Sequence, residues 1–414
     1  MKTLYNIIIT ICSRGIAMAA IFNSKIKTLH KGQKNIFQII ENDMNNDKVR
    51  KVWFHSASLG EFEQGRPIIE AFREANPQIK IIITFFSPSG YEVQKHYKHA
   101  DYVYYLPFDT KKNAQKFIRL VNPLFAVFVK YEFWANYLYC LKNSNIPAYS
   151  VSSIFRQNQI YFKFYGKFFR NTLKYITHFF VQDENSRELL KSININNITI
   201  AGDTRFDRVL QIVGKSKMVA VAEKFVAGHK CLVAGSTWQP DEEIIAACIN
   251  SNPAVKLIIA PHEIKPENIC RIGKMFTEQS VVFSEVDDDT DLSHCRVLII
   301  DNMGMLSSLY RYGQVAYVGG GFGIGIHNTL EAAAYGMPII FGHNYNRFAE
   351  ALDLIELGAA FSVNSADELS KIINRLLTDA VLLESTAAAA KKYVVEKTGA
   401  TEIVLKSLML NVIS

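Results

Sequence analysis

A glycine-rich stretch carries the clearest chemical signature of this sequence. Residues 319–325 contain five glycines and follow an apolar run at 315–318, which predicts a buried strand. His327-Asn328-Thr329-Leu330-Glu331 then opens an Ala-rich run that predicts a helix. Such a segment can bind an anion, because glycines let a ligand approach the main chain and unpaired helix amides point at a phosphate. Glu331 could bind a ribose hydroxyl pair, and the alternative is a tight turn without a ligand.

The spacing of these glycines excludes two common nucleotide motifs. The dinucleotide fingerprint G-x-G-x-x-G would need a third glycine at position 324 or 326, and both positions are isoleucine. The P-loop pattern is also absent from this stretch. We therefore expect a nucleotide monophosphate or a nucleotide-sugar here rather than NAD or ATP.

Two carboxylates follow predicted strands in the first half of the chain. Glu61 comes after the run 52–55, where it could take a proton from an attacking hydroxyl. Its spacing from Ser58 equally fits a helix capping box. Glu132 comes after the run 125–129 and stands among aromatic residues, an unfavourable place for a carboxylate without a function.

Cations and hydroxyls also follow predicted strands. Arg156 and Arg205 suit an anionic substrate through charge-assisted hydrogen bonds, although a surface arginine is usually only solvated. Ser236 and Thr237 are candidate phosphate donors. The histidines lack the helical H-x-x-x-H spacing of a metal site, so no metal is expected.

Short apolar runs alternate with helical stretches along almost the whole chain. This alternation predicts α/β structure, with two doubly wound Rossmann-like domains that face a cleft and bind ligands at the carboxyl ends of their strands. The last helical stretch, 387–410, is expected to pack back across the link between the domains. The predicted strands are 52–55, 80–84, 102–106, 125–129, 148–152, 178–182 and 198–201, then 231–234, 257–260, 281–283, 297–300, 315–318, 339–341 and 359–362.

The net charge of +7 is concentrated at the N-terminus. Residues 1–34 contain six Lys or Arg and no Asp or Glu, so the other 380 residues are close to neutral, which argues against a nucleic-acid-binding body. The apolar segment 4–22 lies within this basic region and predicts an anchor on the inner face of a membrane, either spanning it or lying in its interface. A signal peptide and an ordinary first helix are the alternatives.

Two further features concern the membrane and the redox compartment. The aromatic and basic stretch 160–170 could face a bilayer or the acyl chains of an acceptor, and otherwise forms a half-buried helix. The six cysteines are scattered without a C-x-x-C pair, which suits a reducing cytosol.

Taken in order, the motifs HSASLGE, TFFSPSGYE, YLPFD, KYEFWAN, SSIFR, GDTRFD, AGSTW, APHE, DNMGML and GGGFGIGIHNTLEAA resemble the 3-deoxy-D-manno-octulosonic acid (Kdo) transferases of lipopolysaccharide assembly. The resemblance covers nearly the whole length. It implies a GT-B fold and transfer of Kdo from CMP-Kdo onto a hydroxyl of the lipid A precursor (lipid IVA). It also implies action at the cytoplasmic face of the inner membrane, without a metal or other cofactor.

The resemblance also implies a division into domains. Residues 1–34 would form the membrane anchor, 35–210 an N-terminal acceptor-binding domain and 211–395 a C-terminal CMP-sugar-binding domain. The remaining residues, 396–414, would form the helix that packs back across the link.

The family's functional residues map onto named positions of this chain. The proton acceptor of the family falls on Glu61, the proposed transition-state stabiliser on Glu132, and the basic partner, usually Lys, on Arg205. The family's CMP contacts fall on Pro261, His262, Met303, Gly304, Met305, Asn328, Thr329, Leu330 and Glu331, beside Ser236, Thr237, Gly320 and Gly321 from the phosphate-loop argument.

Some positions depart from the family. Its usual Pro-Arg-His is Pro261-His262-Glu263 here, and its usual Met-Gly-Glu is Met303-Gly304-Met305. The phosphate is therefore expected to be held mainly by the glycine loop and by the hydroxyls after the first strand of the second domain. A UDP-sugar glycosyltransferase or epimerase of the same fold, and a non-catalytic sugar-nucleotide-binding membrane protein, remain as alternatives.

Overall fold

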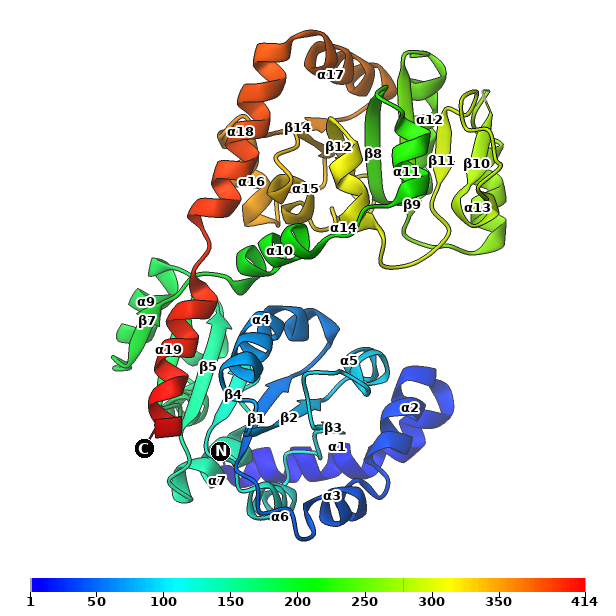
Figure 1. Cartoon of the computed structure of the whole chain (residues 1–414). Helices are drawn as coiled ribbons and strands as arrows, with labels where there is room; N and C mark the ends of the chain where they lie inside the picture. Colours follow the sequence, from blue (N-terminus) through cyan, green and yellow to red (C-terminus); the bar gives the residue numbers. More distant parts are fainter. Residues whose placement is uncertain (1, 278, 414) are drawn as a thin grey trace. The chain divides into compact units, whose positions relative to one another are not determined.

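Two compact units make up the chain. The structure is a computed structural model that describes residues 2–277 and 279–413. Unit 1 runs to Arg208 and resumes at Thr398, and unit 2 spans Val209–Lys397. Each unit holds one seven-stranded parallel sheet with helices packed against it (Figure 1). The predicted fold class, two doubly wound α/β units, is confirmed.

In unit 1 the strands lie in the order β3-β2-β1-β4-β5-β6-β7. The side chains of β1 alternate between two apolar layers: Trp53 packs with the layer that contains Phe117, and Phe54 packs with the layer that contains Phe72. The strand order reverses between the paired strands β1 and β4. The strands are β1 (Lys51–Ser56), β2 (Lys80–Phe85), β3 (Tyr102–Tyr105), β4 (Ala126–Val129), β5 (Ala148–Ser153), β6 (His178–Val181) and β7 (Ile198–Ile200).

In unit 2 the order is β10-β11-β9-β8-β12-β13-β14, and the reversal falls between β8 and β12. Every predicted strand is present, because strands buried on both faces are continuous apolar runs that are visible in the sequence. The strands are β8 (Lys230–Thr237), β9 (Val255–Pro261), β10 (Ser280–Val282), β11 (Val297–Ile299), β12 (Val315–Val318), β13 (Ile339–Gly342) and β14 (Ala360–Val363).

Helices join successive strands in both units. In unit 1 the helices α1 (Lys2–Phe22), α2 (Ser24–Gln33) and α3 (Ile36–Met44) precede the first strand. The helices that lie between strands are α4 (Leu59–Ala75), α5 (Pro88–Gln94), α6 (Lys111–Val121), α7 (Ala135–Asn143), η1 (Ile160–Phe162), α8 (Lys167–Leu173) and α9 (Glu184–Lys191). The first segment of unit 1 ends within α10 (Thr204–Lys215), and its second segment contains the last helix of the chain. Then follow α11 (Ala220–Val226), α12 (Gln239–Asn250), α13 (Pro266–Gly273), η2 (Phe283–Glu285), α14 (Leu306–Leu309), η3 (Tyr310–Tyr312), α15 (Leu330–Ala334), α16 (Ala349–Glu356), α17 (Ala366–Thr378), α18 (Ala380–Glu396) and α19 (Ala400–Ile413).

The helical stretch predicted at 387–410 is divided into α18 and α19. Gly399 has a φ of 108°, a conformation that interrupts a helix and that glycine adopts at little cost. The Asp207 carboxylate accepts hydrogen bonds from the amides of Gly399 and Thr401, at 2.7 and 2.8 Å, and so caps the start of α19. The side chain of Leu408 then joins the apolar layer of unit 1 that contains Phe54.

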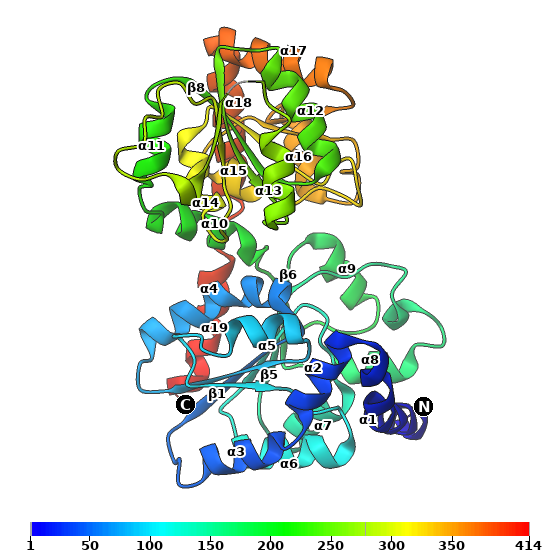
Figure 2. The same ribbon diagram turned by 90° about the vertical axis from the view of Figure 1, so that its right-hand side faces the viewer.

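Two polar side chains of the first helix, α1, are bonded to the rest of unit 1. The Tyr5 hydroxyl donates to Asp109 at 2.6 Å, and the Asn136 side chain donates to Asn6 at 2.8 Å. The Tyr5 ring contacts that of Phe168 in α8, and Figure 2 shows the two helices side by side. The outward side is apolar and exposed, at Leu4, Ile7, Ile8, Ile11, Met18, Ile21 and Phe22. Among the described residues, α1 is the one helix whose length and composition would allow it to cross a membrane.

Candidate active site

Glu61 lies in the first turn of α4, directly after β1. The Ser58 amide donates to Glu61 Oε2 at 3.0 Å, and the Ser58 hydroxyl donates to the same oxygen. The capping box that the spacing allowed is therefore formed. Within residues 2–277 and 279–413, no hydrogen-bond donor contacts Oε1 of this half-buried carboxylate. Capping thus uses one oxygen and leaves the other available to a substrate.

Glu132 lies in the loop that leaves β4. This loop begins at Lys130, whose φ of 61° is left-handed and is uncommon outside glycine. The Trp134 indole donates to Glu132 Oε2 at 2.8 Å, and His55 Nε2 lies 3.4 Å from the same oxygen. The Glu132 side chain keeps 18% of its surface exposed, whereas that of His55 is fully buried. One side of the carboxylate therefore contacts the rings of Trp134 and His55, and the other side is open to solvent.

β1 and β4 are neighbours, so Glu61 and Glu132 follow adjacent strands at the point where the strand order of unit 1 reverses. Ligands of open α/β sheets bind at such a point, outside the carboxyl ends of the strands. The structure thus brings the two predicted carboxylates to the same edge of the sheet.

Several charges converge on Tyr131, which lies between Lys130 and Glu132. Burial raises the pKa of its phenol, and Arg156 acts in the opposite direction. Glu61, Asp183 and Asp203 raise the pKa further through their negative charges. Side chains that follow β1, β5, β6 and β7 therefore act electrostatically on one phenol, which marks this edge as a polar site.

Arg205 stands at the start of α10, after β7. Its Nε donates to Asp203 Oδ2 at 2.8 Å, and its amide donates to Oδ1 of the same carboxylate at 2.9 Å. The guanidinium side chain is 37% exposed. β5 and β6 separate β7 from β4 in the sheet, so Arg205 lies further along the edge than Glu132.

In unit 2 the glycine loop follows β12, at the reversal beside β8. An added Cβ at Gly319 would lie 2.4 Å from the carbonyl oxygen of Ser236, and one at Gly321 would lie 2.5 Å from the amide of Gly342. These two glycines are therefore required for close packing of main chain against main chain. Gly320 has a φ of 93°, in the region that glycine tolerates best.

Most amides of this loop donate within the protein. The Gly320 amide donates to Asp241 at 2.8 Å, and those of Gly323 and Gly325 both donate to the Gly320 carbonyl, at 3.0 and 3.2 Å. The His327 amide donates to the carbonyl of Gly319 at 3.0 Å. These amides already donate hydrogen bonds within the protein. They are therefore engaged in the fold rather than directed at a phosphate, which is the role that the sequence predicts for this loop.

The helix after the loop is shorter than predicted. α15 begins at Leu330, whose amide donates to the Asn328 side chain at 3.1 Å and whose own side chain is fully buried. The Asn328 amide group donates to Glu331 at 3.1 Å. The Thr329 hydroxyl is buried and has no hydrogen-bond partner among the described residues.

The two hydroxyls at the end of β8 differ in their surroundings. Ser236 lies in a bulge with a φ of 55° and is half-buried. The Thr237 side chain is buried, and its hydroxyl lies 3.2 Å from Glu242, which in turn pairs with Arg271 at 2.5 Å. Thr237 therefore holds α12, whereas Ser236 is the more accessible of the two.

Three rings stack at the carboxyl edge of unit 2. The His262 ring lies 4.4 Å from that of Trp238 and 4.6 Å from that of His327, and is nearly parallel to both. The Trp238 indole donates to His327 Nε2 at 3.0 Å. Burial lowers the pKa of His327, and His262 lowers it further, so the His327 ring is neutral at pH 7 with its proton on Nδ1.

The remaining predicted contacts follow neighbouring strands. Pro261 ends β9 and is buried beside the exposed His262. Met303 is 84% exposed, Gly304 has a φ of 87°, and Met305 is half-buried, all in the loop after β11. Since β11, β9, β8 and β12 are consecutive in the sheet, these loops share one edge.

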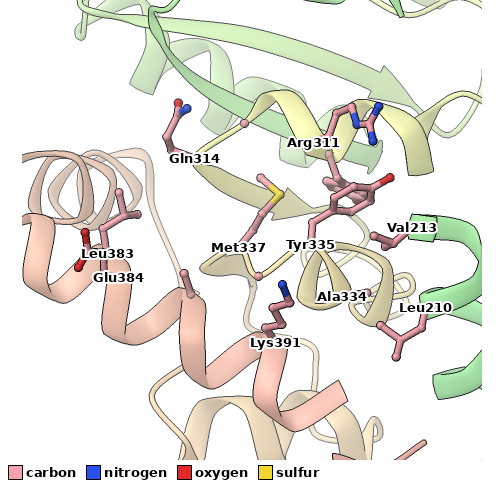
Figure 3. Close-up of a pocket in the computed structure, with 14 residues that line it drawn as sticks. Leu210, Val213, Arg311, Gln314, Ala334, Tyr335, Met337, Leu383, Glu384 and Lys391 are labelled. Carbon is pink, nitrogen blue, oxygen red and sulfur yellow. The ribbon is translucent and has the colours of Figure 1, made fainter. Parts of the chain in front are cut away.

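A separate cavity of unit 2 lies at the opposite edge of its sheet. Figure 3 shows Gln314, which precedes β12, and Met337, which precedes β13, together with Lys391 of α18. The amino ends of the strands meet there, and none of the predicted site residues lines it. It is therefore distinct from the candidate nucleotide site.

Sequence reasoning did not single out His55, Trp238 and Asp241. Asp241 is buried and accepts hydrogen bonds from the Trp238 amide, the Gly320 amide and the Tyr317 hydroxyl, at 2.9, 2.8 and 2.9 Å. A signal was present for His55, which lies within an apolar strand, and for Trp238, which follows one directly, because a buried polar group there needs a partner. Asp241 lies in the first turn of α12, three residues after Trp238, a capping-box spacing. No three His, Cys, Asp or Glu side chains gather as a metal site in the described part of the chain.

The chain is similar to known transferases in sequence. A family model described as 3-deoxy-D-manno-octulosonic-acid transferase (kdotransferase) matches residues 31–208. A 3-deoxy-D-manno-octulosonic acid transferase of Haemophilus influenzae is 25% identical over 371 residues, which cover 86% of this chain and 86% of that protein. A protein of the same description from Aquifex aeolicus is 27% identical over 337 residues, covering 79% of this chain and 86% of that protein.

The fold is shared with solved structures of lower sequence identity. UDP-GlcNAc 2-epimerase from Neisseria meningitidis superposes with a TM-score of 0.61 at 16% identity, covering 87% of this chain and 100% of that one. MurG of Acinetobacter baumannii superposes with a TM-score of 0.54 at 10% identity, covering 87% and 99%. At these identities the similarity concerns the fold alone.

Proposed function

Because the chain belongs to the 3-deoxy-D-manno-octulosonic acid transferase family and is a glycosyltransferase, we propose that it moves Kdo from CMP-Kdo onto a hydroxyl of the lipid A precursor lipid IVA in lipopolysaccharide core biosynthesis. One observation carries this proposal beyond the family. The predicted carboxylates of unit 1 lie where the strand order of its sheet reverses, and so do Ser236 and the glycine loop of unit 2, while the other predicted nucleotide residues follow the neighbouring strands β9 and β11 at the same edge. This is where open α/β sheets bind ligands.

In the proposed reaction Glu61 is the general base. Its uncapped oxygen takes the proton of the acceptor hydroxyl as that oxygen forms a bond to the anomeric carbon of Kdo. The bond from the anomeric carbon to the CMP phosphate breaks, and its electron pair leaves with CMP. Glu132 stabilises the positive charge that develops on the sugar, and Arg205 supplies the basic partner for the anionic groups.

CMP binds, in this proposal, along the carboxyl edge of unit 2. The engaged amides of the glycine loop shape the site, while Ser236 and the imidazole of His262 present polar groups at the exposed edge. The proposed contacts are Ser236, Thr237, Pro261, His262, Met303, Gly304, Met305, Gly320, Gly321, Asn328, Thr329, Leu330 and Glu331.

We propose that α1 lies in the membrane interface rather than spanning the bilayer. Its first turn is bonded to Asp109, and the helix that follows, α2, is bonded through Gln33 to the carbonyl of Leu106 at 2.6 Å. The start of α1 and the end of α2 are therefore both held by the rest of unit 1. A spanning helix separates its ends by about 30 Å across hydrocarbon, which would draw unit 1 into the bilayer.

The proposed membrane face consists of the exposed apolar side chains of α1 together with Phe164 and Tyr165, which are 91% and 56% exposed. Lysines and an arginine of residues 1–34 add attraction for anionic headgroups, so we place the protein at the cytoplasmic face of the inner membrane. An epitope tag at the N-terminus tests the orientation. In sealed vesicles it should be accessible only from the side on which unit 1 lies, whereas access from the opposite side would mean that α1 spans.

Product mass spectrometry tests the transfer itself. The purified protein is incubated with CMP-Kdo and a tetraacyl lipid A precursor, and the lipid should gain the mass of one or more Kdo residues while CMP is released. Parallel reactions with UDP-sugars test the alternative donors of this fold. Binding of CMP without any lipid product would instead favour the non-catalytic binding protein.

We further propose that transfer requires no metal ion, since the charges of Glu61, Glu132 and Arg205 already serve the reacting groups. The rate in excess EDTA should equal the rate in its absence. A loss that Mg²⁺ restores would contradict this part of the proposal.

A further inference from the structure

His55 is a buried, ionisable side chain that the proposed reaction leaves without a function. It ends the apolar part of β1 and is fully buried. Its Nε2 lies 3.1 Å from Trp134 Nε1 and 3.4 Å from Glu132 Oε2. The same indole nitrogen lies 2.8 Å from that Glu132 oxygen, so imidazole, indole and carboxylate form a closed triangle.

The partners of His55 define which nitrogen carries its proton. Nδ1 lies 2.9 Å from the hydroxyl oxygen of Thr84 and 3.1 Å from its carbonyl oxygen. The carbonyl can only accept and the hydroxyl can accept too, so we assign Nδ1 as the donor. The Trp134 indole can only donate, so Nε2 must accept. A neutral ring with its proton on Nδ1 satisfies both contacts when the single Trp134 N–H, which lies between His55 Nε2 and Glu132 Oε2, is shared by these two acceptors. The other neutral tautomer would set the lone pair of Nδ1 against the carbonyl lone pairs.

This tautomer ties Glu132 to the rigid centre of the sheet. The Thr84 hydroxyl accepts from the Trp53 indole at 2.8 Å, and Thr84 and Trp53 belong to the central strands β2 and β1. Glu132 itself lies in a loop without helix or strand, so its main chain alone does not direct the carboxylate. The link from Thr84 through His55 to Trp134 supplies that direction.

The neutral ring also preserves the charge of the carboxylate. A cationic imidazole at this distance would form an ion pair with Glu132 and weaken its attraction for positive charge elsewhere. A neutral acceptor instead holds the indole from behind and leaves the negative charge facing the exposed side.

We propose that His55 is a positioning residue for the transfer: through Trp134 it holds the Glu132 carboxylate in the orientation that stabilises the transition state. This inference rests on the proposed function, in which Glu132 acts on the developing sugar cation. His55 has no contact with substrate in this proposal and acts only through its neighbours.

Two conservative variants distinguish the contact made by Nδ1 of His55 from the contact made by Nε2. In His55→Gln the amide oxygen can reach the place of Nε2 and accept from Trp134, whereas in His55→Asn the shorter amide can replace only Nδ1. We expect His55→Asn to lower kcat about 10- to 100-fold with KM unchanged, since a misplaced group about 1 Å away can cost that much. His55→Gln should stay within a few-fold of the wild type. Equal losses in the two variants would overturn the proposal.

A double-mutant cycle then asks whether His55 acts through Glu132. In a Glu132→Gln background, His55→Asn should cause no further loss of kcat, because the carboxylate that it positions is gone. Multiplying losses would overturn the proposal. Trp134→Phe, which removes the shared N–H, should reproduce the loss of His55→Asn even if one of the histidine variants folds poorly.

Two controls separate this inference from the function on which it depends. Tyr137→Phe removes another buried hydrogen bond of unit 1, the one to the Pro107 carbonyl at 2.8 Å, and should leave kcat unchanged. A wild-type protein that forms no Kdo–lipid product would refute the proposed function. Wild-type transfer with an unaffected His55→Asn would refute only the positioning role.

Discussion

The Asp241 carboxylate accepts a hydrogen bond from the main-chain amide of Gly320 at 2.8 Å, and so ties the first turn of α12 to the glycine loop after β12. The same buried carboxylate also accepts from the Trp238 amide and the Tyr317 hydroxyl. One side chain therefore holds together the segments that carry the glycine loop and the stacked rings. The glycine loop, which the sequence predicts as a ligand-binding loop, therefore also connects β12 to α12 in the fold of unit 2.

Asp241→Ala should destabilise unit 2 strongly. It leaves three buried donors without an acceptor, which we expect to lower the free energy of unfolding by about 3 kcal/mol or more. Chemical denaturation measures this loss, and calorimetry should show weaker CMP binding. Tyr317→Phe removes only one of the three donors and should cost about 1 kcal/mol. Similar losses in both variants would contradict the central place given to Asp241.

Glu61→Gln should abolish transfer while the protein stays folded. Glutamine at this position keeps the capping box with Ser58, because its amide oxygen also accepts from the Ser58 amide. It cannot take a proton from the acceptor. We expect unchanged thermal unfolding and CMP affinity but no Kdo–lipid product. Retained turnover would refute the general base.

Ser58→Ala provides the reverse control. It removes the hydroxyl that donates to Glu61 Oε2 but keeps the amide bond to the same oxygen. Loss of a cap typically costs about 1 kcal/mol. We therefore expect lower thermal stability of unit 1 with transfer largely retained. A complete loss of transfer would show instead that Glu61 needs its contact with the Ser58 hydroxyl for catalysis.

Asp109 should make the stability of unit 1 fall with rising pH. Burial raises the pKa of this carboxyl to about 6, although hydrogen bonds from Tyr5, Asn136 and Tyr137 act in the opposite direction. In the unfolded chain it titrates near the ordinary value of about 3.9. The folded state thus binds the proton more tightly. Its stabilising effect is complete below pH ~4 and is lost as the pH rises through about 6, by about 3 kcal/mol.

Asp109→Asn removes this titration. The free energy of unfolding of the wild type, relative to that of the variant, should therefore fall as the pH rises from about 4 to about 6. Tyr5→Phe removes a donor that favours the charged form, and should shift the transition to higher pH. Denaturation in detergent at several pH values measures both. A wild-type and Asp109→Asn difference that does not depend on pH would refute the assignment.

Ile11→Glu should weaken membrane association. Ile11 is 64% exposed on the apolar side of α1, and a carboxylate there opposes both burial in the interface and attraction to anionic lipid. Flotation with vesicles that contain anionic lipid measures the effect, which should be a several-fold loss of the bound fraction. Val381→Glu, at a 78% exposed position in unit 2, should bind as the wild type does. Equal binding of Ile11→Glu would remove α1 from the proposed membrane face.

The strands and the fold class could be predicted because they depend on short-range patterns. A strand buried on both faces, such as β12, is a continuous apolar run, and a helix such as α17 shows its own period. The one helical stretch predicted at 387–410 was wrong in its continuity. Gly399 marks the break, but its effect depends on Asp207, 192 residues away, which caps the new helix.

The fourteen strands, the order of the chemical motifs and their resemblance to the Kdo transferases could all be predicted from the sequence. Which polar groups already have hydrogen-bond partners is evident only in the folded chain. The amide of Gly320 is bonded to a carboxylate 79 residues earlier, and Glu132 meets a histidine 77 residues earlier. Burial of apolar side chains can be predicted from residue type and period within a short segment. A hydrogen bond between distant residues needs two specific atoms to lie close together, and that depends on how the strands are ordered in the sheet.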